Sequence, residues 1–152
     1  MKASADILRS LNVPFEMKVS SAHRTPVQTH DYVKDADQRG AVAFICAAGM
    51  AAHLAGAVAA NTTKPVIGVP IESSLDGLDA LLSTVQMPGG IPVATVAIGK
   101  AGAKNAAYLA AQIVAVQDAE LAERIKAERQ ANTDAVIAKD AALQEKLANG
   151  EI

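Results

Sequence analysis

The chain has 152 residues, one cysteine and a formal net charge of −2 at pH 7. This length suits one domain with a proper core, so we expect residues 1–152 to form a single domain. No run of Lys and Arg indicates a nucleic-acid-binding surface, and the lone Cys46 cannot pair within the chain. The first residues lack the apolar segment of a signal peptide, so we expect a cytoplasmic protein.

Residues 41–63 contain no Lys, Arg, Asp or Glu and are long enough to span a bilayer. Most of them are Ala or Gly, and His53 lies inside the stretch. Alanine contributes little to membrane insertion. We therefore interpret the stretch as a strand over residues 41–47 followed by a helix over residues 50–60.

Helix and strand patterns alternate along the chain. An apolar face predicts a helix over residues 3–11, and period-two alternation predicts a short strand over residues 14–20. Continuous apolar runs predict buried parallel strands over residues 41–47 and 64–70. The remaining predicted elements are a helix over residues 76–86, a strand over residues 93–99, a helix over residues 101–117 and a polar helix capped by Asp118.

A capping box is predicted after the strand over residues 14–20. Thr25 takes the N-cap position, Pro26 the first helical position, and Gln28 follows Thr25 by three residues. The helix should run to about Gln38 and end at Gly40. The alternation of strands and helices favours a parallel sheet with helices on both faces, and such sheets bind ligands at the carboxyl ends of their strands.

His23 and Arg24 fall at one such strand end, immediately before the predicted helix. The free N–H groups and the dipole of a helix N-terminus favour an anion. Arg24 offers a bidentate donor for a phosphate or carboxylate, and His23 can move a proton near neutral pH. A solvated loop pair explains the same pattern equally well from composition alone.

The segment after residues 41–47 repeats this arrangement. Small side chains at Ala47, Ala48 and Gly49 would let the backbone approach a ligand. His53 follows on the predicted helix, where a lone histidine on an alanine-rich face is more often a core residue than a ligand. No ligand-spaced pair of histidines and cysteines supports a zinc site.

Two other enzyme classes are disfavoured. Residues 98–107 contain G-x-x-G but not the dinucleotide fingerprint, and tight helix–strand packing explains these glycines equally well. A serine hydrolase built on Ser20, Ser21 and His23 would need a G-x-S-x-G elbow, which the sequence lacks.

Aromatic residues make up only 3% of a chain that is 51% hydrophobic. Small side chains bury little area per helix, so we expect some apolar faces to be buried between subunits. The predicted helix over residues 101–117 is apolar around most of its circumference and could supply such a face.

Four motifs together resemble one family, the bacterial N5-carboxyaminoimidazole ribonucleotide mutases, or PurE-type enzymes, of purine biosynthesis. The motifs are S-A-H-R-T-P (residues 21–26), A-A-G-M-A-A-H-L-A-G (47–56), P-V-I-G-V-P-I-E-S-S (65–74) and Q-M-P-G-G-I-P-V (86–93). The resemblance covers nearly the whole chain. The related animal carboxylases usually have lysine at the position of Arg24, which favours the mutase class.

The resemblance implies a flavodoxin-like three-layer α/β/α fold and a cytoplasmic homo-octamer. It implies an isomerase that moves a carboxylate from the exocyclic nitrogen of an aminoimidazole ribonucleotide to ring carbon C4, without a metal or organic cofactor. CO2 would be released transiently and recaptured. His23 would shuttle the proton at C4, and a nearby helix N-terminus should favour its neutral form.

The resemblance also implies the binding residues. Ser21 and Arg24 match positions that hold the ribotide phosphate. The backbone at Ala48 and Gly49 would cradle the carboxylate or CO2. His53 and Leu54 would line the pocket from a second loop, giving a substrate site without metal ligands.

The chain departs from the family in two places. The family opens with a central strand and a G-S-x-S-D motif that this sequence does not contain, and it is glycine-rich around the position of Met50. We expect the chain to fold poorly alone, or to close the resulting gap by moving its strands together. The alternative function is a non-catalytic subunit that binds ribotide weakly or only co-assembles.

Overall fold

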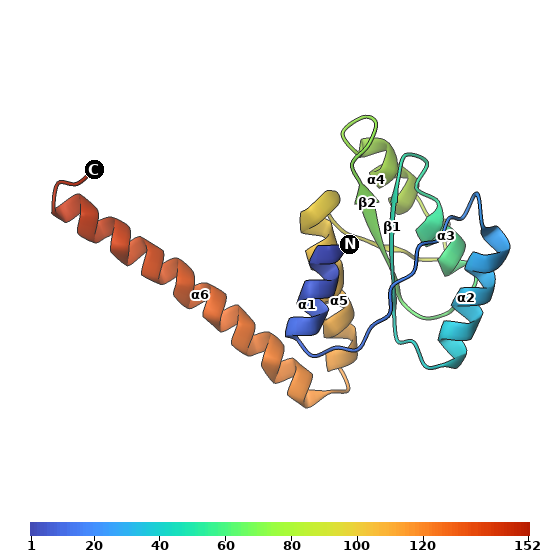
Figure 1. The fold of residues 1–152 in the computed structure, drawn as a ribbon, viewed down its shortest axis with the longest axis horizontal. Helices are drawn as coiled ribbons and strands as arrows, with labels where there is room; N and C mark the ends of the chain where they lie inside the picture. Colours follow the sequence, from blue (N-terminus) through green and yellow to red (C-terminus); the bar gives the residue numbers. More distant parts are fainter. The chain divides into compact units, whose positions relative to one another are not determined.

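A computed structural model describes all residues, 1–152. The chain forms two compact units, Met1–Val114 and Ala115–Ile152. The first unit holds a parallel sheet with β1 (Phe44–Gly49), β2 (Val66–Ile71) and β3 (Ala94–Thr95), in the order β1-β2-β3 (Figure 1). β1 and β2 pair along six residues each, whereas β3 adds only two paired residues.

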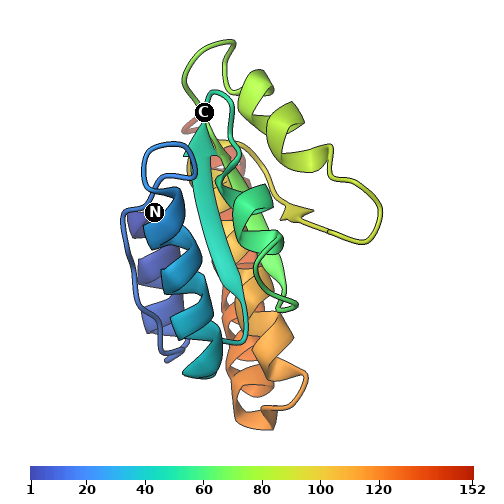
Figure 2. The ribbon, with the colours of Figure 1, turned by 90° about the vertical axis from the view of Figure 1, so that its right-hand side faces the viewer.

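Helices cover both faces of this sheet (Figures 1 and 2). One face carries α2 (Pro26–Gln38), α3 (Leu54–Ala59) and α4 (Leu78–Val85), and the other carries α1 (Lys2–Ser10) and α5 (Gly99–Ala115). The predicted three-layer α/β/α architecture is therefore confirmed, and it is the one expected of a buried parallel sheet.

The core consists of two apolar clusters, one on each face of the sheet. The first contains Val33, Cys46, Ala55, Val58, Ala59 and Val66. The second contains Ile67, Val69, Ala103, Ala106 and Ala110. Because successive strand residues point to opposite faces, Val66 and Ile67 contribute to different clusters. The Ser4 hydroxyl also donates a hydrogen bond to the carbonyl of Ala103, which ties α1 to α5.

Helix α2 begins at Pro26 and ends at Gln38, as predicted, but the predicted capping box is wrong. The Thr25 Oγ1 accepts a hydrogen bond from the Ser21 N–H at 3.0 Å and donates one to the Ser21 carbonyl at 3.0 Å. These bonds commit the hydroxyl to the preceding turn, so it makes no capping bond to the helix.

The predicted strand over residues 14–20 is also wrong. The segment is assigned no secondary structure, and none of the backbone hydrogen bonds joins residues 15–20 to β1. A slot of about 880 Å³ is lined by both segments. The strands have therefore not moved together, contrary to the second alternative expected from the sequence.

Two further boundaries differ from the prediction. Met50 adopts a left-handed backbone, with φ of 56°, so the chain turns before α3 begins at Leu54 rather than at residue 50. The predicted strand over residues 93–99 shrinks to β3. Beyond β3, the Val96 N–H still donates to the Gly68 carbonyl at 3.0 Å.

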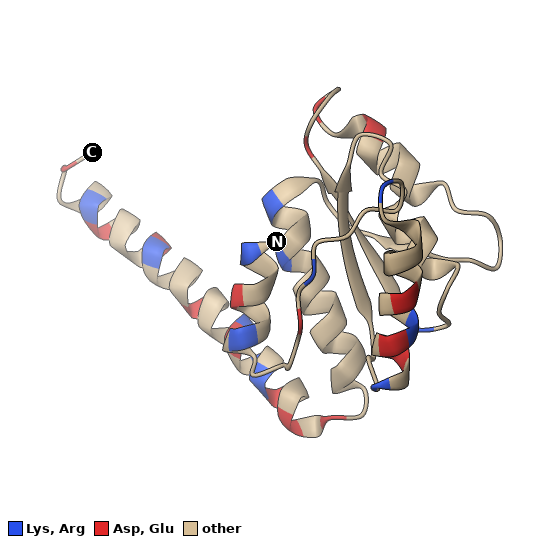
Figure 3. Cartoon of the chain, turned by 45° about the vertical axis from the view of Figure 1, so that its right-hand side comes forward, with Lys and Arg blue, Asp and Glu red and all other residues tan.

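The second unit consists mainly of α6 (Ala119–Ala148). As predicted, Asp118 caps it, because its carboxylate accepts a hydrogen bond from the Leu121 N–H at 2.9 Å. Acidic and basic side chains occur along the whole helix (Figure 3). Of its apolar residues, Leu121 and Ile125 are buried, whereas Val136 is exposed.

The sequence analysis considered residues 41–63 as a possible membrane span. No helix of the structure is both long enough and apolar enough to cross a membrane. The packing interpretation of the G-x-x-G segment does find support. A Cβ added at Gly102 would overlap the carbonyl group of Ala97.

Gly68, in the middle of β2, generates a stability prediction. A Cβ added there would collide with the Thr84 side chain of α4 and lie 2.9 Å from the Val93 Cγ1. Overpacking of this kind costs about 1–3 kcal/mol, so Gly68→Ala should lower the urea midpoint clearly. Gly89→Ala is the matched control, because nothing lies within 4 Å of its added Cβ. Equal midpoints for the two variants would contradict this packing.

Candidate active site

The candidate site lies where α2 and α3 begin. The chain reaches α2 through the turn at residues 21–25, and it reaches α3 from the carboxyl end of β1 through residues 50–53. Parallel strands direct their carboxyl ends to the same edge of a sheet, where ligands bind in this type of fold. The two motifs that were singled out from the sequence therefore both precede helix N-termini.

The rings of His23 and His53 are stacked. Their centroids are 6.0 Å apart and their planes differ by 7°. Both side chains are exposed, and His53 occupies the N-cap position of α3. The interpretation of His53 as a core residue on a helix face is therefore wrong. The left-handed turn at Met50 delays the helix, so His53 precedes it.

The turn at residues 21–25 orients Arg24 and Ser21. The Ser21 Oγ accepts a hydrogen bond from the Arg24 N–H at 3.2 Å. A serine hydroxyl has one donor and two acceptor sites, so Ser21 can still donate its own O–H to a ligand. The Arg24 residue is exposed, and its guanidinium takes part in none of the ion pairs of the chain.

Ala48 and Gly49 are the last two residues of β1, and both are half-buried. A Cβ added at Gly49 would lie 3.1 Å from the Ile71 carbonyl oxygen and 3.6 Å from the Ser73 Cβ. The backbone at Gly49 thus passes close to the end of β2, which agrees with the close approach expected from small residues.

Leu54 differs from the other predicted binding residues. It is the first residue of α3 and is half-buried. It packs against the core cluster that contains Val33 and Cys46, and it lines the slot beside β1. Leu54 therefore anchors the loop over residues 50–53 to the apolar core.

Two residues that lie beside the candidate site were not predicted from the sequence as site residues. Ser73 lies against Gly49 from the loop after β2, and the Met87 Sδ lies 3.3 Å from the position of a Cβ added at Gly56. The same added Cβ would be 3.5 Å from the His53 ring, so Met87 and His53 flank one point on α3. Ser73 follows the end of β2 by two residues, and applying the strand-end rule to β2 would have found it.

The loop after β2 has an unusual backbone. Leu75 and Asp76 both have positive φ, 47° and 53°. Such conformations cost energy for residues other than glycine and often occur at functional sites. No group of three or more His, Cys, Asp or Glu residues could hold a metal ion. The side chains that are present offer proton transfer through two imidazoles and anion binding through a guanidinium and a hydroxyl.

This fold is an α/β fold of the flavodoxin-like type, and side chains suited to acid–base chemistry and anion binding lie before two of its helices. Residues 1–135 match the family model described as AIR carboxylase, and the chain belongs to that family. The resemblance found in the sequence is therefore confirmed.

Individual relatives and a solved structure support the same family assignment. The chain is 58% identical over 134 residues to the N5-carboxyaminoimidazole ribonucleotide mutase of Bacillus subtilis, covering 88% of this chain and 82% of the relative. It is 52% identical over 138 residues to the mutase of the same name from Escherichia coli K12, covering 90% and 82%. The crystal structure of Treponema denticola PurE superimposes with a TM-score of 0.85 at 29% identity, covering 93% of this chain and 88% of that one.

Proposed function

We propose that the chain is an N5-carboxyaminoimidazole ribonucleotide mutase, an isomerase of purine biosynthesis that works in the cytoplasm. Residues 1–152 would act as one domain of the family. The proposal is supported by relatives of that name at 58% and 52% identity. The observation that carries it is the stacked pair of His23 and His53 beside an unpaired Arg24.

Each residue has a role in this proposal. Arg24 and the Ser21 hydroxyl bind the ribotide phosphate, because a guanidinium and a hydroxyl are strong donors to phosphate oxygens. The backbone at Ala48 and Gly49 holds the migrating carboxylate, since its small side chains permit close approach. His53 lines the ring-binding space next to His23, and Leu54 supports that loop from the core.

The proton balance of the reaction explains why a histidine is suited to it. The bond between the exocyclic nitrogen and the carboxylate carbon breaks, and the same carbon then bonds to C4. The nitrogen gains a proton and C4 loses one, so no net proton is consumed. A single imidazole that accepts the proton lost by C4 and supplies the proton gained by the nitrogen balances both steps, and we assign this role to His23.

A second candidate function is a subunit that binds ribotide weakly or only co-assembles. The open slot beside β1 favours it, because a sheet with an incomplete interior is less able to hold its loops rigidly. The two candidates differ in one property, which is turnover by the unmodified protein.

Substitution of His23 tests the mutase proposal. His23→Asn should lower the interconversion of the two carboxylated ribotides by about 10²–10⁴-fold, because general acid–base groups contribute roughly that factor. His30→Asn is the matched control, since His30 is an exposed histidine on α2 whose ring contacts Asp31. It should leave the rate unchanged in a direct absorbance assay.

Two results would contradict the proposal. Turnover by a folded His23→Asn variant at the rate of the unmodified protein would remove His23 from the mechanism. No turnover by the unmodified protein, with folding confirmed by circular dichroism, would favour the non-catalytic subunit.

We further propose that the chain assembles as a homo-oligomer, the octamer implied by the family resemblance. Support comes from an apolar face on α4, where Leu78, Leu82 and Val85 are 53%, 49% and 47% exposed. These residues are spaced by four and three and so share one side of the helix. The helix predicted over residues 101–117 is a weaker candidate for a subunit interface, because Ala110 belongs to the core of its own chain.

Leu82→Glu should therefore dissociate the oligomer, since it places a charge in the centre of that apolar face. Val116→Glu is the control, because Val116 is 83% exposed and lies outside α4. Light scattering measures the mass of each variant. A monomeric unmodified protein, or an intact oligomer of Leu82→Glu, would contradict this interface.

A further inference from the structure

The turn over residues 21–25 carries His23 and is closed by bonds between its own ends. The Thr25 Oγ1 accepts a hydrogen bond from the Ser21 N–H and donates one to the Ser21 carbonyl, both at 3.0 Å. His23 itself is exposed, so burial in the core does not hold its ring. The position of that ring therefore depends on how the closed turn is fixed to the rest of the chain.

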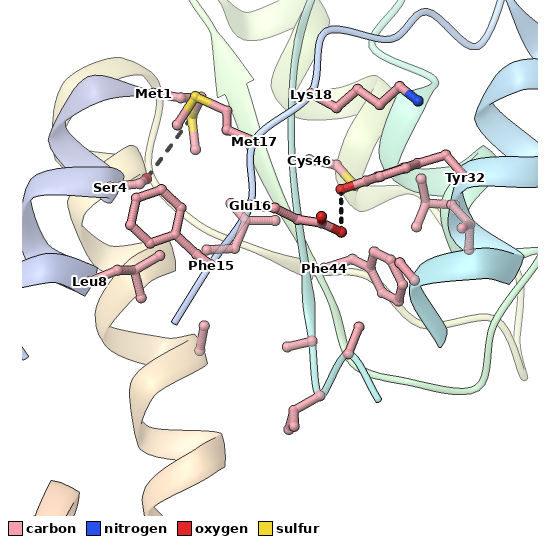
Figure 4. Close-up of a pocket in the computed structure, with 18 of the residues that line it drawn as sticks. Met1, Ser4, Leu8, Phe15, Glu16, Met17, Lys18, Tyr32, Phe44 and Cys46 are labelled. Carbon is pink, nitrogen blue, oxygen red and sulfur yellow. Dashed lines mark hydrogen bonds between the residues drawn. The ribbon is translucent and has the colours of Figure 1, made fainter. Parts of the chain in front are cut away.

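The segment before the turn runs beside α2 and is held there by exposed charges. Figure 4 shows the Glu16 carboxylate facing the Tyr32 hydroxyl, which donates a hydrogen bond to it at 3.0 Å. Arg39 donates to the same carboxylate at 2.6 Å, and both side chains of this ion pair are about half exposed. Exposed ion pairs contribute little and are screened by salt. These contacts therefore hold the segment only weakly, several residues ahead of His23.

One buried side chain of α2, Thr29, meets the segment where it enters the turn. Thr29 is 4% exposed, and its Oγ1 lies 2.5 Å from the Ser20 Oγ. The same Oγ1 lies 2.7 Å from the Thr25 carbonyl oxygen and 3.4 Å from the Ser21 carbonyl oxygen. Thr29 thus contacts the chain on both sides of His23.

The direction of these hydrogen bonds follows from the distances. A threonine hydroxyl has one proton and two acceptor sites. Thr29 donates its proton to the nearer carbonyl, that of Thr25, so the Ser20 O–H donates to the Thr29 Oγ1. Thr29 is therefore the middle of a chain of hydrogen bonds that runs from Ser20 to Thr25. Water competes little for a hydroxyl that is buried in this way.

A second buried threonine shows what is particular to Thr29. Thr84 of α4 is 3% exposed and donates to the Ala80 carbonyl, four residues earlier, at 2.7 Å. Thr29 makes the same bond to Thr25, as serine and threonine commonly do inside helices. Of the two hydroxyls, only that of Thr29 also joins its helix to a segment outside it, through Ser20. The contact with Ser20, rather than the helix bond, is what ties the turn to α2.

We propose that Thr29 is a positioning residue of the candidate site. Its hydroxyl fixes the turn over residues 21–25 on α2, so that the His23 ring stacks on the His53 ring. The effect on turnover rests on the mutase function proposed above, in which His23 exchanges protons with two atoms of the ribotide. A displacement of about 1 Å in such a group can cost about a hundredfold in rate.

Thr29→Val tests the hydroxyl, because valine has nearly the shape of threonine but no O–H. It should lower kcat/KM for the two carboxylated ribotides by about tenfold to a hundredfold. Thr29→Ser keeps the hydroxyl and should restore most of the lost rate. Thr84→Val is the matched control, because it removes the same helix bond from a similarly buried threonine outside the site. It should leave the rate unchanged.

The position of the ring is measured directly and without ribotide. Nuclear Overhauser effects between the ring protons of His23 and His53 report whether the two rings are stacked. They should be present in the unmodified protein, in Thr29→Ser and in Thr84→Val, and absent from Thr29→Val. A merely structural role of Thr29 would lower the urea midpoint and leave these effects in place.

Ser20→Ala breaks the same bond from outside the helix, so it keeps the proposal testable if Thr29→Val does not fold. It should also lose the contact between the rings and lower kcat/KM. Because the two substitutions remove one shared interaction, the double variant should be no slower than the slower of the single variants.

Loss of the ring contact in Thr29→Val and Ser20→Ala, with its retention in Thr29→Ser and Thr84→Val, would support the proposal. Retention of the contact in Thr29→Val, its loss in Thr84→Val, or its absence from the unmodified protein would overturn it. An unchanged rate of Thr29→Val, or additive rate losses in the double variant, would overturn it as well. No turnover by the unmodified protein would contradict the mutase function alone, since the ring contact still decides the role of Thr29.

Discussion

The packing of α2 against α3 and β1 determines both the candidate active site and the slot. Val33 of α2 is 1% exposed and shares an apolar cluster with Cys46 of β1 and Val58 of α3. Residues 15–20 make no ladder bonds to the sheet, so this contact between helices, rather than strand pairing, brings His23 to His53. The same packing holds residues 15–20 beside α2 and away from β1.

The sequence predicted the layers well because buried parallel strands are continuous apolar runs. β2 lies within two residues of its predicted bounds, and α2 begins and ends where Pro26 and Gly40 indicated. The error over residues 14–20 has a physical origin. The alternation of Phe15, Glu16 and Met17 correctly predicts an extended chain with two different sides, but pairing depends on a neighbour that local sequence does not specify.

The site was predicted in part. The strand-end rule correctly drew attention to Ala48 and Gly49 at the end of β1. It also pointed to His23 and Arg24, although no strand precedes them in the structure. Reasoning from the residues alone left a solvated loop equally possible for that pair and favoured a core position for His53. The family motifs supplied the chemistry for His23 and His53. The stack of His23 on His53 could not be predicted, because it depends on the left-handed backbone of Met50, a conformation that methionine rarely adopts. The contact of Ser73 with Gly49 is likewise set by the register of β1 and β2.

The central claim is that His23 and His53 form one ribotide site at the N-termini of α2 and α3. Its most direct test is a histidine-labelled NMR titration of the unmodified chain with 4-carboxyaminoimidazole ribonucleotide. The ring resonances of His23 and His53 should shift together and saturate at the same concentration, while His30, on the exposed surface of α2, should not move. Resonances of His23 and His53 that stay unchanged at saturating ribotide, or that shift no more than His30, would contradict the account.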